Sequence, residues 1–222
     1  MNRLFTLKIK NGIIDYNYEY NLGHTFGQGQ LSPDCMYNFI HISKNGSSFA
    51  KDFSNNWNHS NYFKIKKKVE HIVILRDPTD RWLSGISEFL VGKYSFVGNA
   101  ANDVSEKDVE LLLDNELFKT ILFNFVIFDG HTIPQCCYLR GVNLEDCSFF
   151  YHNDYVFEKI ANHVGIKSPM LYKKINSTQE NTRKKIIIKK LKEMLLNSSE
   201  LQHKIDKHYY ADHQLFDAVR VR

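Results

Sequence analysis

The chain has 222 residues, of which 43% are hydrophobic and 14% aromatic, and its formal net charge is +4. This composition suits one domain with a sizeable core and is too apolar for a disordered chain. The mild positive charge is compatible with an anionic ligand but does not demand nucleic acid. No apolar run approaches the roughly 20 residues that span a membrane, so we expect one domain, residues 1–222, with no nucleic-acid or membrane partner.

The N-terminal residues predict a β-hairpin followed by a loop. Residues 3–20 alternate apolar and polar around Asn11-Gly12, and Asn-Gly suits the type I′ turn of a hairpin. Residues 21–36 are rich in Gly, Ser, Pro and Asn, which predicts a loop. The first residues lack a long apolar stretch and a small-residue cleavage site, which leads us to expect a cytoplasmic protein.

The first strand–turn–helix unit follows this N-terminal extension. Residues 37–42 predict a short apolar strand, and the turn after it contains Lys44, Gly46, Ser47 and Ser48. From Ser47 the pattern predicts a helix to about residue 55, then a polar loop to residue 60.

A second unit has a more apolar strand, residues 71–75, which ends at Arg76. Pro78 suits the first turn of a helix, and apolar residues then recur at helical spacing as far as Leu90. Arg81 and Ser84 are three residues apart, so they share one face of that helix.

The rest of the chain predicts mostly helices. In chain order we expect a helix opened by Ser105 and a helical run to Phe125, a polar turn over residues 129–135, a strand over residues 148–151, a helix from Asn153 to Gly165, a basic helix opened by Ser177, and a helical region over residues 205–216. Strands alternating with helices predict an α/β fold with a parallel core sheet.

In such a sheet the two polar turns lie at the carboxyl ends of neighbouring strands and offer two places for anions. A helix N-terminus presents backbone N–H groups and partial positive charge. In the first turn Gly46 permits close backbone approach and Lys44 adds a point charge. In the second, the guanidinium of Arg76 matches phosphate oxygens. One nucleotide with two separate phosphate groups fits this arrangement.

A simpler interpretation of both turns stays open. The first is then an ordinary β–α turn with a solvated lysine, and in the second Arg76-Asp77 and Asp80-Arg81 form caps and surface ion pairs. The lysine precedes the only glycine, whereas GxxxxGK[ST] places it after the second glycine, which argues against a Walker A loop.

The cysteines predict neither a metal site nor a disulfide framework. Cys35, Cys136, Cys137 and Cys147 form no CxxC spacing. Adjacent Cys136 and Cys137 are therefore expected in the core.

Both turns resemble segments of one enzyme family. Ser43-Lys44-Asn45-Gly46-Ser47-Ser48 resembles the 5′-phosphosulfate-binding loop of sulfotransferases, and residues 76–84 resemble their 3′-phosphate-binding segment, R-D-P-x-x-R-x-x-S. The match is to the carbohydrate, sulfotransferase-2-like branch. Residues 129–135 resemble its D-x-H-x-x-P-Q segment, and residues 205–216 resemble its I-x-x-x-Y-x-x-D-x-x-L-F ending.

The resemblance implies a three-layer, P-loop-like α/β fold with a central, mainly parallel sheet flanked by helices, to which the N-terminal hairpin is added. It implies a reaction that moves a sulfuryl group from 3′-phosphoadenosine 5′-phosphosulfate (PAPS) to an acceptor hydroxyl, on a glycan or small molecule, without a metal. The product is adenosine 3′,5′-bisphosphate (PAP).

The implied roles fall on the matching residues. The 5′-phosphosulfate is assigned to the first turn, through Lys44, Asn45, Gly46, Ser47 and Ser48. The 3′-phosphate is assigned to the second turn, through Arg76 and Ser84. Lys44 also takes the catalytic role of stabilising the charge on the leaving oxygen.

The acceptor hydroxyl needs a general base, and the resemblance favours His131 in the D-x-H-x-x-P-Q turn. His59, His41 and Glu88 stay open as alternatives. Thr132 stands where the family usually has an aromatic residue, and residues 151–154 lack a glutamate often found there, so the acceptor pocket is expected to differ.

Two other functions are compatible with the same turns. One is a P-loop kinase or nucleotidase that uses ATP, which predicts dependence on Mg²⁺. The other is a nucleotide-binding protein of the same fold without catalysis.

Overall fold

The computed structural model describes residues 8–10, 13–15, 27–46, 56–91, 105–124, 130–153, 155–166 and 182–220, which form an α/β structure. The chain divides into two compact units. We call Met1–Asp77, Pro134–Ile175 and Tyr210–Arg222 the sheet unit, and Pro78–Ile133 and Asn176–Tyr209 the helical unit. Each is described by itself, and the predicted single domain stays a prediction.

The sheet unit is built on five strands in the order β5-β3-β4-β6-β7. Their bounds are β3 Gln28–Leu31, β4 Tyr37–Ile40, β5 Asn58–Asn61, β6 Glu70–Leu75 and β7 Cys147–Tyr151. Strands β4, β6 and β7 pair in parallel, whereas β3 pairs antiparallel with both β4 and β5. The sheet is therefore mixed, which corrects the prediction of a mainly parallel sheet.

The predicted α/β class is confirmed and three neighbouring strands are parallel, but the sequence patterns missed two strands. Expected loops contain β3 and β5, whose sequences are QGQL and NHSN. Neither sequence shows the apolar alternation that predicts a strand. Hydrogen bonds from the neighbouring strands hold these polar segments in the sheet.

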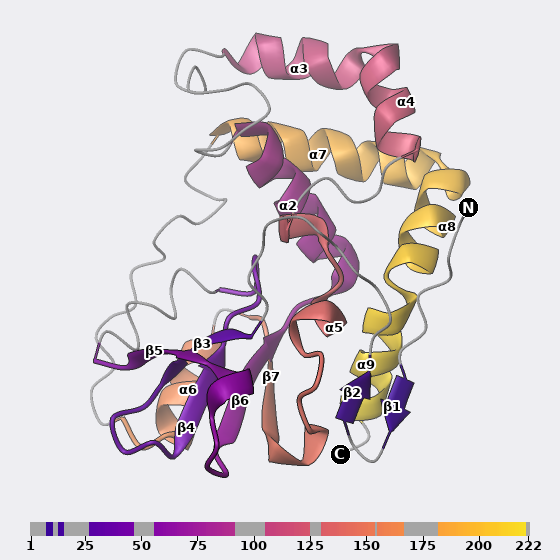
Figure 1. The fold of residues 1–222 in the computed structure, drawn as a ribbon. Coiled ribbons are helices and arrows are strands. Elements are labelled where there is room, and N and C mark those ends of the chain that lie inside the picture. Colours follow the sequence, from indigo (N-terminus) through magenta and orange to yellow (C-terminus); the bar gives the residue numbers. More distant parts are fainter. Residues whose placement is uncertain are drawn as a thin grey trace. The chain divides into compact units, whose positions relative to one another are not determined.

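The apolar core of the sheet unit lies between β4, β6 and helix α6 (Val156–His163) (Figure 1). Its buried side chains are Phe39, Ile72, Ile74, Val156 and Ile160. Alternate residues of a strand point to one face, so Ile72 and Ile74 meet α6 together. Gly165 follows α6 with φ +74, the left-handed conformation that ends many helices.

The predicted N-terminal hairpin is confirmed. Strands β1 (Lys8–Lys10) and β2 (Ile13–Asp15) pair antiparallel, with Lys10 opposite Ile13. This register leaves Asn11-Gly12 as the connection, as the sequence predicts.

The helical unit packs its helices around a continuous apolar cluster. These are α2 Pro78–Val91, α3 Glu106–Asp114, α4 Glu116–Asn124, α7 Thr182–Asn197 and α8 Ser199–His208. Helix α7 lies beside both α2 and α3 (Figure 1). Trp82, Ile86 and Leu90 of α2 recur at helical spacing in this cluster, which confirms the predicted helix. Ser177, the expected cap of the basic helix, lies outside the described residues.

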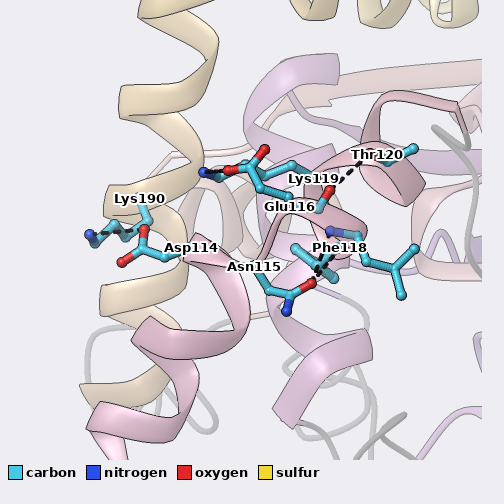
Figure 2. A network of polar contacts seen from close by, with 8 residues as sticks. Asp114, Asn115, Glu116, Phe118, Lys119, Thr120 and Lys190 are labelled. Carbon is cyan, nitrogen blue, oxygen red and sulfur yellow. Dashed lines mark hydrogen bonds and ion pairs between the residues drawn. The ribbon is translucent and has the colours of Figure 1, made fainter.

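Side-chain caps shape the corner between α3 and α4 (Figure 2). Ser105 forms a capping box with Asp108 at the start of α3, as the sequence predicts. At the corner, Asn115 Oδ1 accepts hydrogen bonds from the backbone N–H of Leu117 at 2.9 Å and of Phe118 at 3.1 Å. These bonds satisfy two donors at the start of α4 and so fix where the second helix begins.

Across the described part of the chain, every helix is too short or too polar to cross a membrane.

Candidate functional site

The parallel strands of the sheet unit bring three chain segments to one edge. Strands β4, β6 and β7 are neighbours and run the same way, so their carboxyl ends meet. Lys44 follows β4, Arg76 follows β6 and His152 follows β7. This carboxyl edge is where an open α/β sheet usually binds ligands.

The turn after β4 has a strained backbone. Lys44 has φ +69 and Gly46 has φ +85, both left-handed. That conformation costs a residue with a side chain about 1–2 kcal/mol. A Cβ built on Gly46 would lie 2.8 Å from Phe157 Cζ of α6, too close for any larger residue. The positive φ and the packing against Phe157 therefore both favour glycine here. The predicted close approach of a ligand to this turn stays a prediction.

Asn45 anchors this turn to the neighbouring strand. Its side chain is only 2% exposed, and Nδ2 donates to the carbonyl of Ile74 at 2.7 Å and to Gln135 Oε1. The amide group thus points into the protein and holds the turn in place. The sequence assigns Asn45 to the ligand, and in the structure it acts on the loop that carries Lys44.

Arg76 is tied to the same turn. Its Nη1 donates to the carbonyl of Lys44 at 3.1 Å. Its backbone N–H donates to Gln135 Oε1 at 2.9 Å, and Gln135 Nε2 donates back to the Arg76 carbonyl at 2.8 Å. The two predicted cationic groups are therefore brought together, with Arg76 bracing the Lys44 backbone.

Gln135 is held in turn by a buried carboxylate. Asp212 lies in α9 (Tyr210–Arg220) and is 0% exposed. It accepts hydrogen bonds from the backbone N–H of Gln135 at 2.8 Å and of Cys136 at 2.9 Å, at the start of α5 (Gln135–Tyr138). Charged acceptors on backbone donors make strong bonds. A chain of contacts thus runs from Asp212 through Gln135 to the turn of Lys44.

The sequence treats Gln135 and Asp212 only as parts of two motifs, and their contact is a finding of the structure. They are far apart in the chain, so no local pattern reveals that they meet. Burial raises the pKa of the neighbouring Cys136 thiol, which keeps it protonated. Cys136 and Cys137 are both buried, as expected for core residues.

The remaining predicted residues of the second turn belong to the helical unit. Arg81 is 0% exposed, and its Nη1 donates to the carbonyl of Ile133. Ser84 is also buried, and its carbonyl accepts a hydrogen bond from Ser87 Oγ at 2.9 Å. The assignment of Ser84 to the 3′-phosphate stays a prediction.

His131, the base predicted from the sequence, lies in the helical unit within the short helix η3 (Gly130–Thr132). Tyr209 Oη donates to the carbonyl of Thr132, next to the contact that Arg81 makes. A Cβ built on Gly85 would lie 2.6 Å from the His131 carbonyl, so α2 and η3 approach closely. The backbone of His131 is therefore well fixed, and its side chain is partly exposed.

The alternative bases have their own contacts. Glu88 Oε2 pairs with Lys184 Nζ at 2.6 Å, within the helical unit. His41 Nε2 lies 3.1 Å from Gln30 Oε1. His59 is exposed in strand β5. Ser47, Ser48 and Asp129 lie outside the described residues, so their predicted roles stay predictions.

Sequence reasoning passed over one residue of the carboxyl edge. His152 is exposed, and its backbone N–H donates to the Leu75 carbonyl at 2.7 Å. A Cβ built on Gly46 would lie 3.9 Å from His152 Cδ2. The signal that finds it is its position directly after the third parallel strand.

The carboxyl edge combines Lys44 and Arg76 with two histidines, His41 after β4 and His152 after β7. Asp77 is the acidic residue that follows Arg76. Among the described residues no group of three or more His, Cys, Asp or Glu side chains is arranged to hold a metal ion. The edge has the chemistry to bind an anion and to move a proton.

Comparison of the chain with protein-family models, with curated proteins and with solved structures gives no match. The sulfotransferase resemblance is therefore carried by the motif residues alone, and their arrangement is what the structure adds.

Proposed function

We propose that the protein is a PAPS-dependent sulfotransferase with a three-layer, P-loop-like core. It moves a sulfuryl group from PAPS to a hydroxyl group of an acceptor, and the acceptor we propose is a carbohydrate. The observation that carries the proposal is the contact chain at the carboxyl edge. Asp212, Gln135, Asn45 and Arg76 come from four segments that each resemble a sulfotransferase motif, and they bond to one another.

The first turn fits a phosphosulfate. Gly46 lets the turn pack closely against Phe157 of α6, which holds its backbone in place. Lys44 stands in a strained conformation, of a kind that persists at ligand sites when the surroundings enforce it. Here Asn45 and Arg76 enforce it through their bonds to the neighbouring strand and to the Lys44 carbonyl.

Each residue then has a distinct task. PAPS supplies an activated sulfuryl group. Lys44 places its ammonium group at the oxygen that leaves with the phosphate and stabilises the charge that develops there, which is worth on the order of 10²–10³ in rate for a single donor. Ser47 and Ser48 donate to the same end, whereas Arg76 and Ser84 hold the 3′-phosphate. Gln135 and Asp212 keep both turns in register.

Calorimetric titration with PAP, and with ATP in the presence and absence of Mg²⁺, tests the proposal. We expect PAP to bind more tightly than ATP and without Mg²⁺. Tighter binding of ATP that requires Mg²⁺ would instead identify a kinase or nucleotidase. Binding of PAP without any turnover of PAPS would identify a nucleotide-binding protein without catalysis.

Two matched variants locate the ligand. Arg76→Ala should weaken PAP and leave adenosine 5′-phosphosulfate, which lacks the 3′-phosphate, nearly unaffected. Equal weakening of both ligands would show that Arg76 acts only by bracing the Lys44 turn. Lys66→Ala is the control, because Lys66 is an exposed lysine before β6, at the opposite end of that strand.

A further inference from the structure

The geometry of the carboxyl edge places one unassigned histidine beside the first turn. Leu75 of β6 is paired with Tyr151 of β7, and His152 is the residue that follows Tyr151 at the end of β7. Its backbone N–H donates to the Leu75 carbonyl at 2.7 Å, which extends the pairing by one residue. His152 is therefore positioned by the sheet and not by a free loop.

The ring of His152 borders the turn itself. Its Cδ2 lies 3.9 Å from the position of a Cβ on Gly46, on the side of the turn against which Phe157 packs. The end of β7 is further held by Tyr151, whose ring centroid lies 5.5 Å from that of Phe216 in α9. The residue is exposed, so a second substrate can reach it.

We propose that His152 is the general base of this site and accepts the proton of the acceptor hydroxyl. The inference rests on the proposed sulfuryl transfer. A ring nitrogen of His152 takes the proton while the acceptor oxygen forms a new bond to sulfur. The bond from sulfur to the bridging oxygen breaks, and its electron pair stays on the phosphate oxygen, where Lys44 neutralises it. Atoms and charge balance with no further reactant.

The sheet unit has five other described histidines, one of which, His213, follows Asp212 in α9. His71 and His163 are at the amino end of β6, where His163 Nε2 contacts Glu70 Oε1 at 2.5 Å and His71 Nδ1 contacts Asn38 Nδ2 at 3.1 Å. His41 contacts Gln30, and His59 lies within β5 at the edge of the sheet. His41 also follows a parallel strand at this edge, because it comes directly after β4, but its ring contacts Gln30 of β3. The ring of His152 instead borders Gly46 of the Lys44 turn.

Several charged residues adjoin the edge that carries His152. Lys44 and Arg76 are the cations of the adjoining turns, Asp77 follows Arg76, and α6 contributes the apolar ring of Phe157.

The first test uses binding alone and needs no acceptor. In protein labelled with ¹⁵N at histidine, the ring resonances of His152, assigned by their loss in His152→Asn, should shift when PAP is added. The ring of His203, exposed on α8, is the internal control and should not shift. Unchanged His152 resonances with PAP bound would overturn the proposal.

The second test measures turnover of PAPS as release of PAP, with water and with unsulfated heparosan as acceptors. His152→Asn should bind PAP as the wild type does, lower kcat by about 10²–10⁴-fold, as expected for loss of a general base, and remove the acidic limb of the pH profile. His203→Asn should behave as wild type.

The remaining outcomes separate this inference from the proposed function. Wild-type kcat and pH profile in His152→Asn, with activity lost in His131→Asn or His59→Asn, would overturn the role of His152 and leave the sulfotransferase standing. No binding of PAP by the wild type, or binding without turnover of PAPS, would overturn both.

Discussion

The two ends of strand β6 carry different polar networks. At the carboxyl end, Arg76 is joined to Gln135 and through it to Asn45 and Asp212, a network of amides and one carboxylate. At the amino end, Glu70 contacts His163 and Ser148 on one face. On the other face, His71 contacts Asn38, whose Oδ1 accepts from Ser60 Oγ at 2.5 Å.

The difference lies in which groups titrate. The carboxyl-end network contains no histidine among these four residues, so it can keep the Lys44 turn in place across the neutral range. The amino-end networks each contain a histidine, and acid can disrupt them without touching the site. Stability and ligand geometry should therefore respond separately to mutation and to pH.

The largest effect is expected from Asp212→Ala. Removing this buried carboxylate leaves the N–H groups of Gln135 and Cys136 without their acceptor, which should cost about 3–4 kcal/mol in the free energy of unfolding. Chemical denaturation measures this loss. Asp217→Ala, at an exposed position of the same helix, is the control and should change little.

Affinity for PAP separates the positioning role from stability alone. Asp212→Asn keeps the size of the side chain and one acceptor, so it should fold. If it binds PAP as tightly as the wild type, the network stabilises the fold without positioning the Lys44 turn.

Gly46→Ala should have the second-largest effect. We expect it to lower the free energy of unfolding by about 2 kcal/mol, from backbone strain and overpacking together. Gly165→Ala is a matched control, because Gly165 has a similar φ of +74 and nothing within 4 Å of an added Cβ. The difference between the two variants measures the contact with Phe157. Equal losses would show that the turn has room on its α6 side.

Particular residues show what could be predicted from the sequence. The apolar runs of β4, β6 and β7 and the spaced apolar residues of α2 predict these elements, because burial dominates their formation. Strands β3 and β5 are polar and depend on partners distant in the chain. The turn residues Lys44, Gly46 and Arg76 follow from local motifs. The bonds of Gln135 to Asn45, and of Asp212 to Gln135, depend on how the chain returns to the sheet, which no local pattern contains.

At the amino end of β6, His71 should make stability depend on pH. Burial lowers the pKa of His71 from its ordinary value of 6.5, while the carboxylate of Asp146 raises it by a smaller amount. In the unfolded chain the histidine therefore binds its proton at a higher pH than in the folded protein. The contribution of neutral His71 to the stability of the fold is complete above about pH 6.5. It is lost as the pH falls toward the lower pKa that His71 has in the folded protein.

Denaturation curves between pH 8 and pH 5 measure this loss. Burial also lowers the pKa of His208, to about 3, so the wild type has a second group with the same sign. The contribution of His71 is thus the difference between wild type and His71→Asn, whose amide oxygen can still accept from Asn38. If the two proteins lose stability in parallel, His71 does not contribute.

Glu70→Gln should have the smallest effect. Partial burial raises the pKa of Glu70, but the hydrogen bonds from Ser148 and His163 outweigh it, so the pKa lies below the ordinary 4.5. Its stabilisation is present above about pH 4.5 and is lost as pH falls through the folded value. Both side chains of the Glu70–His163 pair are about a third exposed, so we expect a loss of less than about 1 kcal/mol in the free energy of unfolding. Because these groups lie at the far end of β6 from Lys44 and Arg76, the affinity for PAP should not change. A fall in that affinity would show that the two ends of the strand are coupled.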